Sequence, residues 1–282
     1  MLMYLAHFGL DQMPFHLTPD TRFFLGLAPH FEAIQTVGAA LEMGEGVIKI
    51  TGEVGTGKTM VCRMLLTHLA QDIVLLYLPN PALNGSELRR AVATELKLNV
   101  PDDRDLVERI QTELMALHFA GKRVIAMVDE AQALSDDALE TLRLFGNLET
   151  ENAKLLQIVL IGQPELDSRL AQHHLRQFRQ RITFSAQLRP LTLEETVAYI
   201  DNRLHKSGAS GELFTLNQKK ALWRACRGIP RLINQVCHKA LLLTYFAQQP
   251  KVSNQQLYSA VHDTFDTCKP KFKTPQLWGW SH

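Results

Sequence analysis

The sequence lacks an apolar run long enough to cross a bilayer: its longest runs, such as Ala240–Ala247, fall far short of the roughly 20 residues that a transmembrane helix needs. It also has no basic leader before Leu10, so we expect no secretory signal. None of its four cysteines pairs with another in a C-x-x-C motif, which argues against zinc sites and small disulfide scaffolds. These absences favour a folded cytoplasmic protein with reduced thiols.

The charge is unevenly distributed, although the net charge is only +1. Residues 1–200 carry 18 Lys and Arg against 25 Asp and Glu, a net charge of −7, whereas residues 201–282 carry 12 against 4, a net charge of +8. A basic C-terminal part can face phosphates, an acidic protein, anionic lipid or nucleic acid. A solvated basic face without a ligand explains the same charge, because no basic run is dense.

Five short apolar runs alternate with longer amphipathic segments, which is the pattern of a mostly parallel sheet covered by helices on both faces. The predicted strands are Val47–Thr51, Ile73–Leu78, Val124–Val128, Leu156–Ile161 and Ile182–Leu188. The predicted helices between them are Lys58–Ala70, Ser86–Leu98, Asp105–Ala120 and Asp136–Glu149.

Beyond Pro190 the strand pattern ends and helical segments follow one another. Thr192 and Glu195, three residues apart, form a capping box at the start of the first one. The further predicted helices are Thr215–Arg227, Pro230–Ala247 and Ser253–Asp266, the last opened by the capping pair Ser253 and Gln256. We therefore predict a core domain over residues 1–189, a helical domain over residues 190–268 and a tail over residues 269–282. The tail holds Trp278 and Trp280, which could anchor a partner or pack back on the protein.

A glycine-rich loop directly follows the first predicted strand. Its sequence, Gly52-Glu53-Val54-Gly55-Thr56-Gly57-Lys58-Thr59, has the pattern G-x-x-x-x-G-K-[ST], and a helical stretch continues from Met60. The glycines let consecutive backbone N–H groups point at one phosphate, Lys58 neutralises the outer phosphates, and Thr59 ligates magnesium. The loop through Met60 therefore predicts a binding site for a nucleoside triphosphate with its Mg²⁺.

Two acids end the predicted strand Val124–Val128. Asp129 comes at the carboxyl end of this strand, beside the glycine-rich loop, and can hold magnesium through its water shell. Glu130 can polarise the attacking water, so it indicates a protein that hydrolyses the nucleotide and does not only bind it. A purely structural protein that holds ATP without turnover is therefore disfavoured. Strands often end at charged residues. The two acids therefore indicate a site only if their strand lies in the same sheet as the strand that leads into the glycine-rich loop.

Gln163 follows the predicted strand Leu156–Ile161 and reaches the same edge of the sheet. Its amide can contact both the γ-phosphate and the attacking water. A surface amide before the turn at Pro164 is the alternative explanation. Because no N-K-x-D sequence for guanine occurs, ATP is the expected nucleotide.

With these motifs and the following helical part, the sequence resembles the AAA+ ATPases. The resemblance narrows to the ExeA-like ATPases of bacterial secretion and pilus systems, on the segments FGLDQMPFHLTPDTRFFL, GEVGTGKT, VDEAQ, LIGQPEL, RQFRQRI and GIPRLIN. It covers about residues 8–265 and implies an α/β P-loop AAA+ core with a five-stranded, mostly parallel sheet, followed by a small all-helical lid. ExeA itself also has a membrane span and a periplasmic peptidoglycan-binding part; neither is evident here, so wall binding is not expected.

The resemblance also implies roles for individual residues. It gives phosphate and Mg²⁺ binding to the glycine-rich loop, metal support to Asp129, water activation to Glu130 and a first-sensor role to Gln163. Arg231, in GIPRLIN, fits the second sensor, an arginine of the lid that reaches the γ-phosphate. Pro230 suits the first position of a helix and would fix Arg231 near its opening, although an arginine that only faces solvent is the alternative.

Three arginines, Arg176, Arg179 and Arg181, lie together before the last predicted strand. By its place relative to Ile182–Leu188, Arg181 best matches the arginine finger, the arginine that clamp-loader relatives supply to the ATP site of a neighbouring subunit. A finger supplied in trans completes the site only at a subunit interface, so that nucleotide binding and assembly are linked. We therefore expect a nucleotide-dependent homo-oligomer.

The resemblance implies an ATPase that couples nucleotide state to the assembly of a bacterial pilus or secretion apparatus. It would work in the cytoplasm and reach the inner membrane through assembly proteins there. A DNA-associated ATPase of the transposition-regulator type is the alternative, since those regulators resemble the same core and the helical part here is basic. The sequence shows no separate helix-turn-helix module, so nucleic acid is the less expected partner.

Overall fold

The computed structural model describes residues 3–68, 72–79, 84–98 and 105–269, which form two compact units. Within the described residues, the helical unit comprises residues 3–29, 55–60 and 189–269, and the sheet unit comprises residues 30–54 and 61–188. This grouping differs from the predicted division at residue 189, because the N-terminal segment and part of the glycine-rich loop go with the helices. The predicted tail lies outside the described residues, apart from Lys269.

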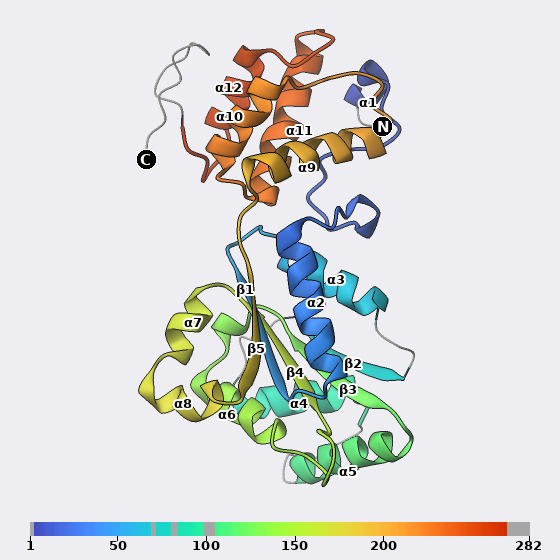
Figure 1. The fold of residues 1–282 in the computed structure, drawn as a ribbon, viewed down its shortest axis with the longest axis vertical. Helices are drawn as coiled ribbons and strands as arrows, with labels where there is room; N and C mark the ends of the chain where they lie inside the picture. The colour runs from blue at the N-terminus through green and yellow to red at the C-terminus, as the bar shows by residue number, and fades with distance from the viewer. Residues whose placement is uncertain (1–2, 69–71, 80–83, 99–104, 270–282) are drawn as a thin grey trace. The chain divides into compact units, whose positions relative to one another are not determined.

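Five parallel strands form one sheet in the order β2-β3-β4-β1-β5 (Figure 1). Each strand begins and ends within one residue of its predicted position. Strands β1, β3 and β4 are largely buried and apolar, whereas the edge strand β5 alternates between exposed and covered residues. The predicted parallel α/β sheet is thus confirmed. The strands are β1 (Val47–Gly52), β2 (Ile73–Leu78), β3 (Arg123–Val128), β4 (Gln157–Gly162) and β5 (Ile182–Leu188).

Helices cover both faces of this sheet (Figure 1). Val37 of α2 (Ala28–Glu42) and Leu65 of α3 (Lys58–His68) share one apolar cluster with Met127 of β3. The opposite face packs against α4 (Gly85–Glu95), α5 (Leu106–Phe119) and α6 (Asp136–Phe145), in a cluster that contains Val128. Successive residues of β3 therefore point to opposite clusters, as the pleat of a strand requires.

Helix α6 ends four residues earlier than predicted. The chain after Phe145 turns back on itself: the N–H of Thr150 donates to the carbonyl of Ala153 at 2.9 Å, and Glu149 pairs with Lys154 as an antiparallel bridge. This turn leads directly into β4. Two short helices that sequence periodicity does not reveal, α7 (Glu165–Leu170) and α8 (Arg176–Arg179), connect β4 to β5.

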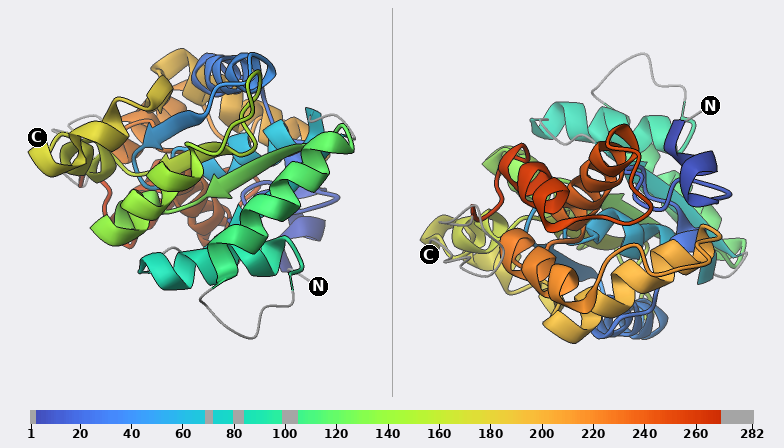
Figure 2. Two further views of the ribbon diagram at one scale, coloured as in Figure 1. Left: turned by 90° about the horizontal axis from the view of Figure 1, so that it is seen from below. Right: turned by 90° about the horizontal axis from the view of Figure 1, so that it is seen from above.

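The helical unit packs around an apolar core of its own, and Figure 2 shows its later helices in orange and red. The predicted capping boxes, Thr192 with Glu195 and Ser253 with Gln256, are both formed. No helix in the described part of the chain is long and apolar enough to cross a membrane. The helices are α1 (Met3–Phe8), α9 (Leu193–Lys206), α10 (Leu216–Cys226), α11 (Pro230–Phe246) and α12 (Asn254–His262).

The N-terminal segment packs into the core of the helical unit through residues such as Tyr4 and Phe15, and a buried arginine adds polar contacts. The guanidinium of Arg203, on α9, donates to the carbonyl of Pro14 at 2.8 Å. It also lies over the rings of Phe23 and Tyr199, at 5.2 and 5.0 Å from their centroids. Because Arg203 is only 4% exposed, these contacts with the N-terminal segment compensate for the desolvation of a charge.

Candidate functional site

The predicted site residues of the sheet unit follow three adjacent strands. Strand β4 lies between β3 and β1, and Thr51 of β1 pairs with Gly162 of β4. Gln163 therefore comes at the level of Gly52, where the glycine-rich loop begins, while Asp129 follows β3 on the other side of β4. In a parallel sheet these carboxyl ends share one edge, which is where ligands of open α/β sheets bind.

The glycine-rich loop has the backbone that its sequence predicts. Gly55 and Gly57 have positive φ angles of 83° and 104°, which residues with a Cβ rarely adopt, and α3 begins at Lys58. Within the helical unit, the N–H of Arg231 donates to the carbonyl of Gly55 at 3.2 Å. Helix α11 begins at Pro230, as predicted, so its first turn lies against the loop. The sensor role of Arg231 stays a prediction.

Asp129 has a partner that sequence reasoning missed. The phenol of Tyr77, on the adjacent strand β2, donates to Oδ2 of Asp129 at 3.3 Å, and the N–H of Glu130 donates to Oδ1 at 2.9 Å. Burial, and secondly the charge of Asp129, raises the pKa of Tyr77, which keeps its phenol protonated as a donor. The aspartate is thus oriented by its neighbours, as metal-supporting carboxylates commonly are.

Glu130 and Gln163 meet in a network of amides. Oε2 of Glu130 accepts hydrogen bonds from Nε2 of Gln132 at 2.5 Å and from Nε2 of Gln163 at 3.1 Å. Oε1 of Gln132 accepts from the backbone N–H of Gln163 at 3.0 Å. The structure therefore brings two predicted residues together, both directly and through a third, Gln132, which sequence reasoning did not single out although it lies in VDEAQ.

The backbone of Glu130 is unusual as well. Its φ angle is 51°, in the left-handed region that non-glycine residues rarely adopt. The turn Ala131–Ala133 that follows is closed by a hydrogen bond from the N–H of Ala133 to the carbonyl of Glu130, at 2.8 Å. Such conformations concentrate at functional sites, where surrounding contacts maintain them.

The arginine cluster lies away from Asp129 and Glu130 of its own chain. Arg176 and Arg179 are the ends of α8, Arg181 comes just before β5, and all three are exposed. Arg181 is at the amino end of β5, whose seven residues span about 20 Å. The length of a strand therefore separates it from the carboxyl ends of the strands, where Asp129 and Glu130 lie. Its charge, after the hydrogen bond and charge of Lys154, helps to lower the pKa of Glu149. The structure does not bring Arg181 to Glu130 of the same chain.

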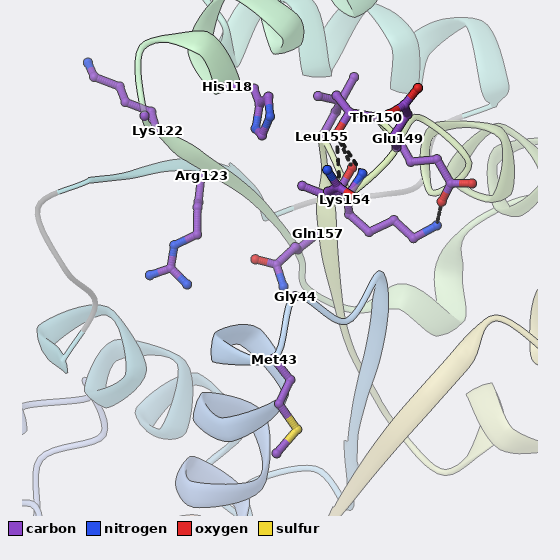
Figure 3. Close-up of a pocket in the computed structure, with 14 residues that line it drawn as sticks. Met43, Gly44, His118, Lys122, Arg123, Glu149, Thr150, Lys154, Leu155 and Gln157 are labelled. Atoms are coloured by element: carbon purple, nitrogen blue, oxygen red, sulfur yellow. Dashed lines mark hydrogen bonds and ion pairs between the residues drawn. The ribbon is translucent and has the colours of Figure 1, made fainter.

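A hollow of about 630 Å³ opens at this amino-terminal edge of the sheet (Figure 3). Its walls include Arg123 and Gln157, the first residues of β3 and β4, together with the turn that carries Glu149 and Lys154. Arg123 forms an ion pair with Asp72, and Lys154 forms one with Glu149. None of the predicted site residues lines this hollow.

Comparisons with known proteins bear on the fold that carries these residues. Residues 41–170, which include the glycine-rich loop, both acids and Gln163, match the family model described as AAA domain. The structure of Cdc6p from Pyrobaculum aerophilum matches with a TM-score of 0.68 at 15% identity, over 86% of this chain and 70% of that chain. The fold is that of a P-loop AAA domain.

Other relatives of the AAA fold extend the comparison. The ORC1 protein of Aeropyrum pernix, solved in complex with DNA, has a TM-score of 0.65 at 19% identity, over 89% of this chain and 69% of that one. At such identities the likeness shows the fold alone. General secretion pathway protein A of Aeromonas hydrophila is 40% identical over 266 residues, which are 93% of this chain and 48% of that protein. The chain thus spans about half the length of this curated relative.

Proposed function

We propose that this AAA protein is a magnesium-dependent ATPase that couples nucleotide state to assembly of a bacterial pilus or secretion apparatus. The observation that carries the proposal is the 40% identity to General secretion pathway protein A over nearly the whole chain. Within the ExeA-like ATPases the sequence most resembles MshM, the ATPase of mannose-sensitive haemagglutinin pilus biogenesis. We place its work in the cytoplasm and, through assembly proteins, at the inner membrane.

The residues of the carboxyl edge fit this chemistry. The hydroxyl of Thr59 and the oriented carboxylate of Asp129 are oxygen ligands of the kind that Mg²⁺ prefers, and Mg²⁺ would neutralise charge on the phosphates. Glu130 accepts a proton from the attacking water, and Gln163 senses the γ-phosphate. Arg231, in the first turn of α11, would connect the nucleotide to a lid domain formed by the helices after residue 190.

A genetic experiment tests the cellular part of the proposal. Deleting the gene in its own bacterium should abolish the pili, which electron microscopy counts, and with them the mannose-sensitive haemagglutination of the cells. The wild-type gene should restore both, whereas a Lys58→Ala gene, expressed at the same level, should restore neither. Normal piliation of the deletion strain would overturn the pilus assignment without touching the proposed ATPase activity.

Replacing Tyr77 with Phe keeps the ring and removes the hydroxyl that donates to Asp129. Because outer partners orient metal-supporting carboxylates, we expect the Mg²⁺ concentration for half-maximal ATP hydrolysis to rise roughly tenfold. Titrating Mg²⁺ at saturating ATP measures this shift. Tyr245→Phe, the same change on α11, is the matched control, and equal Mg²⁺ dependence of both variants and the wild type would contradict the assignment.

Replacing Arg181 with Ala tests whether a neighbouring subunit completes the site. We expect hydrolysis per subunit to fall roughly 10- to 100-fold, because the arginine stabilises charge on the transferring phosphoryl group. Wild-type activity per subunit should also rise with protein concentration.

Mixing two impaired variants shows whether Arg181 acts in the ATP site of a neighbouring subunit or in that of its own chain. An equal mixture of Arg181→Ala and Glu130→Gln should regain about a quarter of wild-type activity, since half of the sites keep Glu130 and half of those face an intact Arg181. Arg176→Ala and Arg179→Ala are the matched controls on the same surface. No recovery on mixing, with flat activity over a wide concentration range, would refute the shared site.

A further inference from the structure

The side-chain amide of Gln132 uses both of its ends within the candidate site. Its Nε2 donates to Oε2 of Glu130 at 2.5 Å, and its Oε1 accepts from the backbone N–H of Gln163 at 3.0 Å. Glu130 follows β3 and Gln163 follows the adjacent β4. One side chain thus connects the ends of two strands that carry the proposed base and the proposed sensor.

The backbone around Gln132 is held by a neighbouring helix. The guanidinium of Arg169, on α7, donates to the backbone carbonyl of Gln132 at 2.8 Å and also to the backbone carbonyl of Leu134. Gly162 leaves the necessary room, because a Cβ there would lie 3.1 Å from Oε1 of Gln132 and 2.9 Å from Leu166. The residue is half-buried, and its amide is oriented by its hydrogen bonds to Glu130 and to the backbone of Gln163.

Two amides donate to the same oxygen of Glu130, and they are not equivalent. Gln163 Nε2 lies at 3.1 Å and has a second proposed task at the γ-phosphate, whereas Gln132 Nε2 lies at 2.5 Å and is anchored at its other end. When the Gln163 amide turns towards a phosphate, the contact with Gln132 remains to orient the carboxylate. A carboxylate that must accept a proton from one water depends on that orientation.

We propose that Gln132 is a positioning residue for ATP hydrolysis. It orients the Glu130 carboxylate relative to Gln163. The proposal rests on the proposed ATPase function and on the roles of Glu130 and Gln163 in it. Gln132 does not itself touch the reacting atoms. Its loss should therefore slow the chemical step while leaving nucleotide binding intact.

Two substitutions separate the two ends of the amide. Gln132→Met keeps the length of the side chain but removes both the donor and the acceptor. Gln132→Glu keeps an acceptor for the N–H of Gln163 but removes the donor and places a second carboxylate beside Glu130. Gln111→Met, the same change at an exposed position of α5, is the matched control.

For Gln132→Met we expect kcat to fall roughly tenfold, with KM and the Kd of a fluorescent ATP analogue within about twofold of the wild type. The kcat of Gln132→Glu should fall further than that of Gln132→Met, because the carboxylates of Glu130 and of the new glutamate repel each other. In a Glu130→Gln background, Gln132→Met should have no further effect on residual turnover, since the two residues act as one unit. Steady-state phosphate release on the full chain measures all of these values.

The outcomes distinguish this inference from the proposed function. Wild-type protein that does not hydrolyse Mg-ATP would refute the function and the inference with it. A wild type that is active, with an inactive Glu130→Gln variant and a Gln132→Met variant of unchanged kcat, would refute the inference alone. So would a defect that appears only in KM, or one that adds fully to Glu130→Gln. If thermal unfolding shows Gln132→Met less stable than the Gln111→Met control, the kcat of Gln132→Glu decides.

Discussion

The Glu130→Gln variant is expected to hydrolyse ATP about 10³-fold more slowly than the wild type while ATP stays bound. The amide has nearly the shape of the carboxylate, so the turn at Ala131–Ala133 and the left-handed backbone of Glu130 should persist. It cannot accept a proton from the attacking water, and it meets the amides of Gln132 and Gln163 without a negative charge. Binding depends instead on the glycine-rich loop, which the substitution does not touch.

Two measurements on the same preparation check this prediction. Phosphate release under saturating Mg-ATP gives turnover, and rapid gel filtration followed by nucleotide analysis shows whether unhydrolysed ATP remains with the protein. Glu108→Gln, which removes an exposed carboxylate on α5, is the control and should match the wild type in both. Unchanged turnover in Glu130→Gln would remove this residue as the base, whereas lost ATP binding would mean that its main role is structural.

The parts of the fold that follow from short stretches of sequence were predictable. The buried strands are recognisable as apolar runs and the edge strand β5 as an alternating one. The capping pairs Thr192 with Glu195 and Ser253 with Gln256 act within one turn of a helix. The glycine-rich loop is equally local, because its glycines, Lys58 and Thr59 are contiguous. The end of α6 was not predictable to the residue, since the turn after it depends on the pairing of Glu149 with Lys154.

The contacts that depend on strand order were not predictable. Nothing in the apolar run of β2 indicates that it pairs with β3, and only that pairing brings Tyr77 to Asp129. The link between Glu130 and Gln163 likewise requires β3 and β4 to be neighbours. The grouping of the N-terminal segment with the helical unit rests on contacts between residues far apart in the chain, such as the hydrogen bond from Arg203 to Pro14 and the packing of Phe15 in the helical core.

Replacing Gly55 with Ala is expected to weaken ATP binding at least about 100-fold, which corresponds to about 2.7 kcal/mol. Gly55 has a φ angle of 83°, and a Cβ built on it would lie 2.6 Å from Cβ of Arg231 and 3.2 Å from Cγ2 of Ile229. These neighbours are close to the backbone at the opening of α11, so no side-chain rotation relieves the overlap. Either the loop or the first turn of α11 must move, and with it the N–H groups that would face the phosphates.

A second glycine separates this overlap from the cost of the left-handed backbone alone. Gly44 has a φ angle of 80°, but a Cβ added there meets nothing within 4 Å. Gly44→Ala should therefore lose only about 1–2 kcal/mol of the free energy of unfolding and keep its affinity for ATP. Isothermal titration with a non-hydrolysable ATP analogue and thermal unfolding of both variants make the comparison. Equal ATP affinity of the two variants would show that neither the overlap with Arg231 and Ile229 nor a strained backbone at position 55 disturbs nucleotide binding, and would contradict this prediction.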